Sequence, residues 1–190
     1  NNLNPSGEPQ CHILTGHTLQ RLLDENRLLI DTSQPFLNRL FQSMKTGSFD
    51  VSLFDRNGYL LQVMQDDRYV EINRRYKWYP GVLWSEEYCG SNVVASVLKQ
   101  KKPVQIIGPQ HYLQWCHIVT GSGAPIIDPD GELIGGIAII TLLFATHPHT
   151  LGMAVSAAQA IENEIRVQNA YSLQKAIITS IPEALIAINV

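Results

Sequence analysis

Neither an excess of positive charge nor a long apolar run occurs in this 190-residue sequence. The 14 Lys and Arg residues are outnumbered by 17 Asp and Glu, which gives a net charge of -3. Nucleic-acid binding needs clustered Lys and Arg for phosphate contacts, so this composition argues against a DNA- or RNA-binding surface. The nearest approach to a basic cluster is Arg74, Arg75 and Lys77. Three such charges are typical of a solvated face.

The apolar stretches are short. The longest, 133–145, is interrupted by Gly135, Gly136 and Thr141, and it falls short of the ~20 residues that a membrane-spanning helix needs. Its Ile content favours a buried strand instead. Because the sequence also opens without a signal-peptide pattern, we expect a cytoplasmic protein that makes no membrane contact.

Cysteine is sparse. Cys11, Cys89 and Cys116 are odd in number and far apart in the sequence, which indicates a reducing compartment rather than a disulfide framework. Hydrophobic residues make up 45% of the chain and charged residues 16%, so the chain can bury a core of its own. Its length suits one domain plus a helix or part of a second domain.

The hydrophobic period changes along the chain. Residues 1–14 contain Pro5, Gly7 and Pro9 and are predicted to be a flexible tail. Two helices follow, because Leu, Ile and Phe recur at helical spacing on both sides of a break that we place at Thr32 and Ser33. Pro35 fits the first turn of the second helix, which is expected to end near Gly47.

Two hairpins are predicted between short apolar segments. Each turn ends in Gly, which supplies the positive φ that a tight turn needs. A helix over 92–101 and a buried strand over 104–107 lie between the hairpins. Because hairpins require antiparallel neighbours, the predicted fold class is α+β, with a central antiparallel sheet of five or six strands and helices on both faces. The paired segments are 51–54 with 59–64, and 124–127 with 133–140.

A long helix is predicted over about 150–180. It carries a stripe at 4-3-4-3 spacing, which is typical of a short coiled-coil seam. We therefore expect a parallel homodimer that associates through Ile161 and Ile165. The alternative is that the first half of the stripe packs on the domain's own sheet. The stripe consists of Ala154, Ala158, Ile161, Ile165 and Gln168.

One ordered set of motifs resembles a known family. Segment 84–92, WSEEYCGSN, resembles the W-x-E-x-x-x-G-T-N signature of GAF domains in sigma-54-dependent transcription activators, of the type that regulates acetoin and dihydroxyacetone catabolism. The resemblance covers about residues 27–164. Further family motifs follow in the expected order: Pro103-Val104, Gly108 with His111-Tyr112, Ala124-Pro125-Ile126, Asp128-Pro129-Asp130-Gly131, Leu133-Ile134-Gly135 and His147-Pro148-His149.

The resemblance implies a domain layout. Residues 15–150 form the GAF-like sensory domain with its N-terminal helices, 151–180 a connecting signalling helix, and 181–190 the start of a truncated PAS-like domain. In the family, an AAA+ ATPase and a helix-turn-helix follow. Contacts with DNA and sigma-54 RNA polymerase are therefore expected only through domains absent from this sequence, which contains no G-x-x-x-x-G-K phosphate loop.

The function implied is sensory and not enzymatic. The domain is expected to bind a small metabolite or a regulatory protein and to transmit the signal through its C-terminal helix. Some members of the family respond to kinase subunits, so a protein partner remains an alternative to a small metabolite as the signal. Two alternatives remain: a ligand-free dimerisation scaffold, and GAF-type thiol-dependent reduction of methionine sulfoxide. For that chemistry only Cys89 is well placed, because Cys11 falls in the tail.

Six residues are the candidates for a ligand site: Trp84, Glu86, Asn92, His111, Tyr112 and Trp115. Trp84 offers an indole wall beside the polar groups of Glu86 and Asn92, although Asn92 is also suited to cap the helix that follows it. The other three belong to the densest aromatic cluster of the chain. Neither a catalytic residue nor a metal site is expected, because adjacent Cys116 and His117 would point to opposite faces of a strand.

Overall fold

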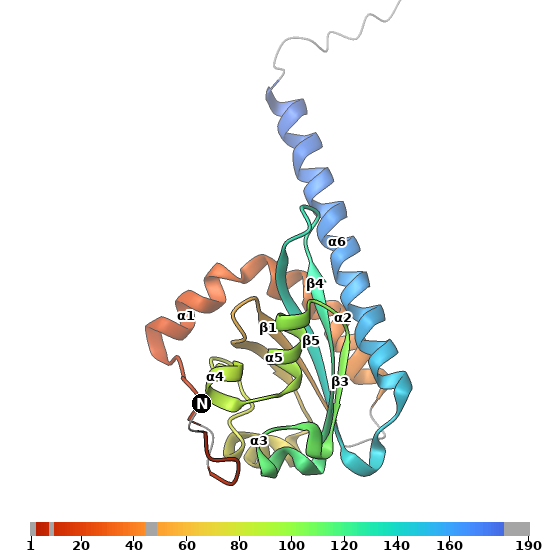
Figure 1. Cartoon of the computed structure of the whole chain (residues 1–190). Helices are drawn as coiled ribbons and strands as arrows, with labels where there is room; N and C mark the ends of the chain where they lie inside the picture. The colour runs from red at the N-terminus through yellow and green to blue at the C-terminus, as the bar shows by residue number, and fades with distance from the viewer. Residues whose placement is uncertain (1–2, 8–9, 45–48, 181–190) are drawn as a thin grey trace, which may run out of the picture.

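The computed structural model of the chain describes residues 3–7, 10–44 and 49–180 (Figure 1). At its centre lies a five-stranded antiparallel sheet with strand order β2-β1-β5-β4-β3. The predicted α+β class with a central antiparallel sheet is confirmed. The strands are β1 (Phe49–Asp55), β2 (Leu60–Met64), β3 (Val104–Ile107), β4 (Val119–Ile127) and β5 (Leu133–Leu142).

Both predicted hairpins are present, and an aspartate organises each turn. In the β1–β2 turn, Asp55 Oδ1 accepts hydrogen bonds from the backbone N–H groups of Asn57, at 3.0 Å, and Tyr59, at 2.8 Å. In the β4–β5 turn, Asp128 Oδ1 accepts in the same way from two backbone N–H groups. Gly58 has φ +98°, the left-handed conformation that such a turn requires. Local side-chain chemistry therefore determines both turns.

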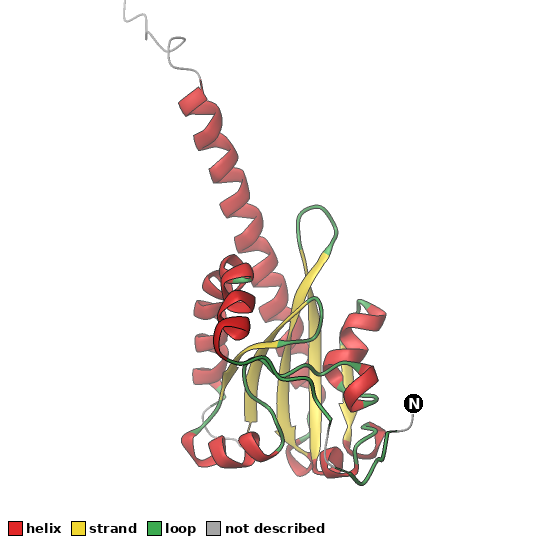
Figure 2. Ribbon diagram, turned by 90° about the vertical axis from the view of Figure 1, so that its left-hand side faces the viewer, coloured by secondary structure: helices red, strands yellow, loops and turns green. Residues whose placement is uncertain are grey.

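Two long helices cover one face of the sheet: α2 (Arg27–Ser43) and α6 (Pro148–Ser180) (Figures 1 and 2). Leu37 of α2 and Ile161 of α6 are fully buried against Leu53 and Ile137 of the sheet and their neighbours. Burial of side chains of this size stabilises a fold by about 1.5–3 kcal/mol each. This layer is the larger of the two cores.

The burial of α6 contradicts one prediction. The side chains of Ile161 and Ile165 are only 0% and 3% exposed, and Ala154 and Ala158 are buried beside them. The stripe therefore packs on the domain's own sheet and on α2. This agrees with the alternative prediction, that the first half of the stripe packs on the sheet. The prediction of a homodimer interface through Ile161 and Ile165 is wrong, because neither side chain is available to a second copy.

The opposite face carries shorter elements, α3 (Val70–Arg75), α4 (Glu86–Cys89) and α5 (Val93–Gln100). Helix α5 lies directly on β4 because Gly121 and Gly123 have no side chains there. A Cβ on Gly121 would lie 2.7 Å from Cβ of Val93, and one on Gly123 would lie 2.8 Å from methyl groups of Val93 and Val97. The predicted strand at 104–107 is present as β3, but it is half-buried because it forms an edge of the sheet.

The helix break near the N-terminus lies earlier than predicted. Helix α1 (Gly16–Glu25) ends at Asn26, whose backbone N–H and side-chain amide both donate to the Leu22 carbonyl oxygen. Thr32 and Ser33 do not interrupt a helix; they are buried inside α2, and Pro35 also lies inside it. Burial of the apolar face of α2 outweighs the hydrogen bond that proline removes.

The described part of the N-terminal tail follows the surface of the domain, although the sequence predicted a flexible segment. Ile13 forms an antiparallel bridge with Val82. The backbone N–H of Gln114 donates to the carbonyl oxygen of Pro5, at 2.9 Å. Pairing of backbone groups with distant loops therefore holds this segment in place. The predicted start of a PAS-like domain at 181–190 lies outside the described residues.

No helix within the described ranges is long and apolar enough to cross a membrane.

Candidate functional site

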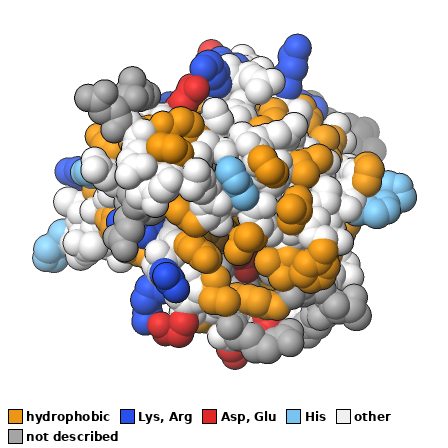
Figure 3. Space-filling model, turned by 60° about the horizontal axis from the view of Figure 1, so that its bottom comes forward, with side chains coloured by type: hydrophobic (Ala, Val, Ile, Leu, Met, Phe, Trp, Pro, Cys, Tyr) orange, Lys and Arg blue, Asp and Glu red, His pale blue; other side chains and the backbone are white. Residues whose placement is uncertain are grey.

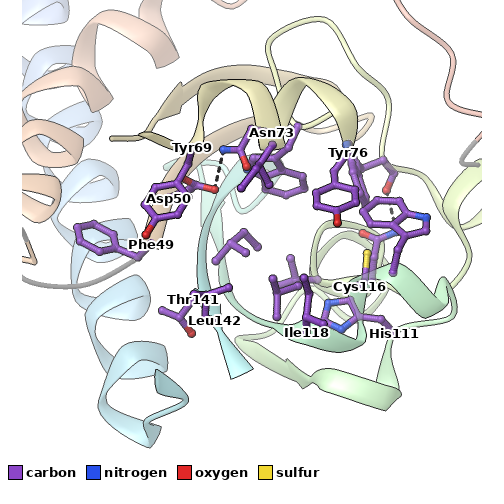
Figure 4. Close-up of a pocket in the computed structure, with 18 residues that line it drawn as sticks. Phe49, Asp50, Tyr69, Asn73, Tyr76, His111, Cys116, Ile118, Thr141 and Leu142 are labelled. Carbon is purple, nitrogen blue, oxygen red and sulfur yellow. Dashed lines mark hydrogen bonds between the residues drawn. The ribbon is translucent and has the colours of Figure 1, made fainter. Parts of the chain in front are cut away.

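A cavity of about 100 Å³ lies between the end of the sheet and helix α3 (Figure 4). Strands β1 and β5 contribute Asp50 and Thr141, and α3 contributes Asn73. The turns η2 (Gly108–Gln110) and η3 (Gln114–Ile118) lead to its other side, where His111 and Trp115 line it. On this side of the molecule, hydrophobic side chains gather around a hollow (Figure 3). An apolar hollow with few polar groups is the usual form of a small-molecule site.

Aromatic rings form much of the cavity wall. Tyr76 and Trp115 are stacked, with ring centroids 4.8 Å apart and an angle of 3° between the planes. Trp84 meets Trp115 edge to face at 5.8 Å, and Trp78 meets Trp84 in the same way at 4.8 Å. The indole N–H of Trp78 donates to Ser52 Oγ at 2.9 Å. These contacts hold the rings in fixed positions and give the cavity a rigid apolar surface.

Asp50 is the most unusual polar group at the cavity. Its side chain is only 7% exposed. Oδ2 accepts a hydrogen bond from the side-chain amide of Asn73 at 2.8 Å, whereas Oδ1 has no hydrogen-bond partner. Burial raises the pKa of this carboxyl to about 6, and the hydrogen bond from Asn73 opposes that rise. The charge of Asp50 therefore changes near pH 6.

Two further polar atoms at the cavity lack a partner. Within the described part of the chain, six buried side-chain polar atoms make no hydrogen bond, and three of them belong to residues that line this cavity. These three are Asp50 Oδ1, Trp115 Nε1 and Thr141 Oγ1. Buried polar atoms without a partner are uncommon in native proteins, and each calls for a water, an ion or a ligand.

Four of the six predicted site residues line the cavity: Trp84, Asn92, His111 and Trp115. Asn92 also caps α5, since its Oδ1 accepts from the backbone N–H of Ala95 at 3.0 Å. Its amide group donates to the carbonyl oxygens of Gly90, at 2.9 Å, and Trp84, at 3.3 Å. The capping role is thus confirmed. Burial lowers the pKa of His111, which keeps its ring neutral near pH 7.

The other two predicted site residues lie elsewhere. Glu86 is exposed and pairs with Lys99, whose Nζ lies 2.8 Å from Glu86 Oε2. Tyr112 donates its hydroxyl hydrogen to the Leu3 carbonyl oxygen at 2.6 Å. The Tyr112 ring packs against Gly90, where a Cβ would find no room. Both residues fix the surroundings of the cavity without lining it.

Residues 17–163 match the family model described as MimR, N-terminal domain. The chain belongs to this family of MimR N-terminal domains. It is 29% identical over 167 residues to the acetoin dehydrogenase operon transcriptional activator AcoR of Bacillus subtilis, covering 88% of this chain and 28% of AcoR. It is 26% identical over 148 residues to the propane 2-monooxygenase operon transcriptional activator MimR of Mycolicibacterium smegmatis, covering 77% of this chain and 25% of MimR.

A further relative of this MimR-type domain is the signal-transduction and transcriptional-control protein of Clostridium beijerinckii, 28% identical over 156 residues, or 82% of this chain and 25% of that protein. The chain thus spans about a quarter of the length of these curated relatives. Among solved structures, the Escherichia coli DhaR(N)–DhaL complex matches with a TM-score of 0.90 and 15% identity, covering 95% of this chain and 62% of that chain. At that identity the match concerns the fold.

Sequence reasoning missed the polar side of the cavity in this MimR-type domain. Asp50 and Ser52 alternate with Val51 and Leu53 along β1, and such alternation predicts a solvent-facing polar side. The whole strand is buried instead, because α3 and the aromatic rings cover that side. Among the described residues, no group of three or more His, Cys, Asp or Glu side chains is placed to hold a metal ion.

Proposed function

We propose that this domain is the signal-receiving part of a cytoplasmic transcription activator and that the cavity beside Asp50 binds a small-molecule signal. The unpaired Oδ1 of Asp50, buried among aromatic rings, is the observation that carries the proposal. Its relatives AcoR and MimR are named as transcriptional activators, which supports a regulatory and not an enzymatic role.

The chemistry of the cavity favours a small, neutral and largely apolar ligand with one hydrogen-bond donor. Such a donor satisfies Asp50 Oδ1, and the aromatic wall covers the apolar part of the molecule. None of the 18 residues that line the cavity is Lys or Arg. An anionic ligand would therefore face the carboxylate of Asp50 without a compensating positive charge.

The signal leaves the cavity through β5 and α6. Thr141 and Leu142 line the cavity at the end of β5, and the turn η4 (Leu143–Ala145) connects them to the start of α6. In Figure 1, α6 continues well beyond the sheet. A ligand that binds one position of β5 more tightly than another shifts the population of α6 positions. Residues 151–180 then act as a connecting helix towards a PAS-like domain, with the ATPase and DNA-binding domains beyond it.

We also propose that the projecting half of α6 pairs with the same helix of a second copy. Val167, Tyr171 and Ile178 are 62%, 68% and 55% exposed. Their spacing of four and seven residues places them on one stripe of the helix, as in a coiled-coil seam. Pairing would bury these side chains, which the domain itself leaves in water.

Binding of a ligand at Asp50 is tested by thermal-shift and calorimetric screening of small alcohols, phenols and ketones. A compound that binds the unmodified chain should raise its melting temperature. Asp50→Leu, which fills a similar volume without the carboxyl group, should lose that shift. An exposed control, Asp24→Leu, should keep it. If no compound of these classes binds, or if Asp50→Leu binds as well as the unmodified chain, the cavity is not the sensory site.

A regulatory protein is the second candidate for the signal. Phe144 is 86% exposed, Ile118, which also lines the cavity, is 52% exposed, and Leu143 packs against Gly108. Apolar side chains that gather in an exposed patch mark protein interaction surfaces, and this proposal takes Phe144 and Ile118 as parts of one such patch. One solved structure that shares the fold contains DhaR(N) in complex with DhaL. Loss of partner binding in Phe144→Ser, with small-molecule binding absent in the unmodified chain, would favour this candidate.

A further inference from the structure

The sulfur atoms of Cys11 and Cys89 lie 3.2 Å apart, although 78 positions separate the two residues in the sequence. This pair was not predicted, because Cys11 falls in the segment expected to be flexible. Both are free thiols in this structure. The separation is about 1 Å longer than the ~2.05 Å of a disulfide bond. A small local movement is therefore enough to join the two sulfurs.

Backbone hydrogen bonds hold Cys11 at this position. The N–H of Leu83 donates to the carbonyl oxygen of His12, and the N–H of Leu14 donates to that of Gly81, each at 2.9 Å. These bonds lie immediately C-terminal to Cys11 and pair its segment with a loop on the surface of the domain. The approach of Cys11 to Cys89 is thus built into the fold.

Helix α4 holds Cys89 in place. It ends α4, where its backbone N–H donates to the carbonyl oxygen of Ser85 at 3.0 Å. Its side chain is 1% exposed, whereas Cys11 is partly exposed. Cys11 is therefore the more accessible of the two residues to a solute, and the Cys89 sulfur lies 3.2 Å from its own.

The electrostatics give the two thiols different roles. The hydrogen bond from Cys89 lowers the pKa of Cys11, and the positive charge of Lys77 lowers it further, against the effect of burial. The same interaction and burial raise the pKa of Cys89. Cys11 is therefore the thiol that ionises more readily and attacks an oxidant. Cys116 is buried, and burial raises its pKa to about 12, so it stays a thiol.

We propose that Cys11 and Cys89 form a reversible disulfide and are a site of oxidative modification by small peroxides. This site is independent of the cavity at Asp50, and it adds a second input to the proposed sensory function. The position of a partly exposed thiol against a buried one, on two separately anchored segments, carries the inference.

The reaction balances with hydrogen peroxide as the oxidant. The Cys11 thiolate attacks one peroxide oxygen, the O–O bond breaks, and the leaving hydroxide takes a proton to become water. Cys89 then attacks the sulfur of the Cys11 sulfenic acid, so that an S–S bond forms, the S–O bond breaks, and a second water leaves with the proton of Cys89. Two thiols and one peroxide give one disulfide and two waters. A dithiol reductant reverses the change.

Oxidation would tie the tail to the wall of the domain. The disulfide would join the segment around Cys11 to the end of α4. Gly90 follows Cys89 directly, and its carbonyl oxygen accepts a hydrogen bond from Asn92, which lines the cavity. Peroxide would therefore stiffen a segment that contacts the ligand-binding wall.

The test uses the 190-residue chain, treated with one equivalent of hydrogen peroxide and then denatured and alkylated. We expect one alkylated thiol in place of three, and a peptide pair that links Cys11 to Cys89. Dithiothreitol should restore three alkylated thiols. The oxidised chain should melt at a higher temperature than the reduced chain. A link between Cys89 and Cys116, a dimer joined through Cys11, or three remaining thiols would overturn the proposal.

Variants assign the order of the steps. Cys116→Ser should form the link as the unmodified chain does. Cys89→Ser, or Cys89→Ala if serine is poorly tolerated in the buried position, should leave Cys11 as a sulfenic acid that dimedone labels. Cys11→Ser should leave Cys89 unoxidised at the same dose. If Cys89 is labelled in Cys11→Ser and Cys11 is not labelled in Cys89→Ser, the assigned roles are wrong.

Discussion

Thr32 on α2 donates a hydrogen bond of 3.1 Å to Oε1 of Gln168 on α6. The two residues are 136 positions apart in the sequence, and their bond joins α2 to α6 at the point where α6 leaves the domain. On the domain side, Ile165 is buried, whereas Tyr171 beyond it is 68% exposed. The bond thus marks the boundary between a helical segment that belongs to the core and one that is free to contact another molecule.

The first prediction concerns that free segment. Val167→Asp combined with Tyr171→Asp should convert a dimer of the chain into a monomer, because charges placed in a coiled-coil seam oppose burial. Sedimentation velocity measures the change, and circular dichroism should show an unchanged fold. Ser172→Asp is the matched control, because Ser172 lies outside this stripe of the helix, and it should remain dimeric. A monomeric unmodified chain at tens of micromolar would refute the seam.

Asp50 should make the stability depend on pH. Its pKa is raised from 3.8 to about 6, so the folded chain binds the proton more tightly than the unfolded chain between these values. The unfolding free energy is therefore higher below about pH 4 and falls as the pH rises through 6. In the Asp50→Asn variant, the new side chain still accepts the hydrogen bond from Asn73 but does not titrate. The variant therefore does not lose unfolding free energy at this site as the pH rises. Relative to the unmodified chain, its unfolding free energy should rise by up to about 3 kcal/mol between pH 4 and pH 8.

Urea unfolding of both proteins across that range measures the effect. The difference between them is informative because other shifted groups are common to both. Burial raises the pKa of Asp55 as well, and burial lowers that of His111; both contributions cancel in the comparison. Parallel curves for the two proteins would mean that Asp50 does not titrate in this range.

Asn92 should matter for stability through two separate sets of bonds. Asn92→Ala loses the cap of α5, which alone costs about 0.5–2 kcal/mol, and also the donations to Trp84 and Gly90. Asn92→Asp keeps the acceptor for Ala95 but loses both donations, so its unfolding free energy should lie between those of the alanine variant and the unmodified chain. Amide hydrogen exchange at Ala95 should accelerate in Asn92→Ala and stay slow in Asn92→Asp. Equal exchange in the two variants would contradict the capping role.

Two glycine substitutions should change stability in opposite directions. Gly121→Ala forces a Cβ to within 2.7 Å of Val93 and should lower the unfolding free energy by about 1–3 kcal/mol, as overpacking does. Gly152→Ala, on the exposed side of α6, meets no atom within 4 Å and should raise it by about 0.5–1 kcal/mol, because alanine is the better helix former. Urea unfolding measures both. A neutral Gly121→Ala would mean that α5 can shift away from β4.

The features that the sequence predicts well are those that neighbouring residues determine. The hairpin turns follow from Asp55 and Asp128 with their glycines, and the cap of α5 follows from Asn92. The partners of long-range contacts were not predictable in this way. The buried state of Asp50 depends on α3 and the aromatic rings that cover it, and the burial of Ile161 depends on α2. A 4-3-4-3 stripe has the same pattern whether its partner is the same domain or a second copy.

On the proposed function, the glycines of β4 also bear on the size of ligand that the cavity can accept. With only hydrogen atoms at Gly121 and Gly123, α5 rests on the backbone of the sheet and has no side chains between them to compress. If the cavity binds a ligand as proposed, Val93 has no room to move towards β4, and we expect a larger molecule to displace α3 outwards instead. That displacement stretches the hydrogen bond between Asn73 and Asp50. On the proposed function, we therefore expect the hydrogen bond between Asn73 and Asp50 to limit the size of ligand that the domain accepts.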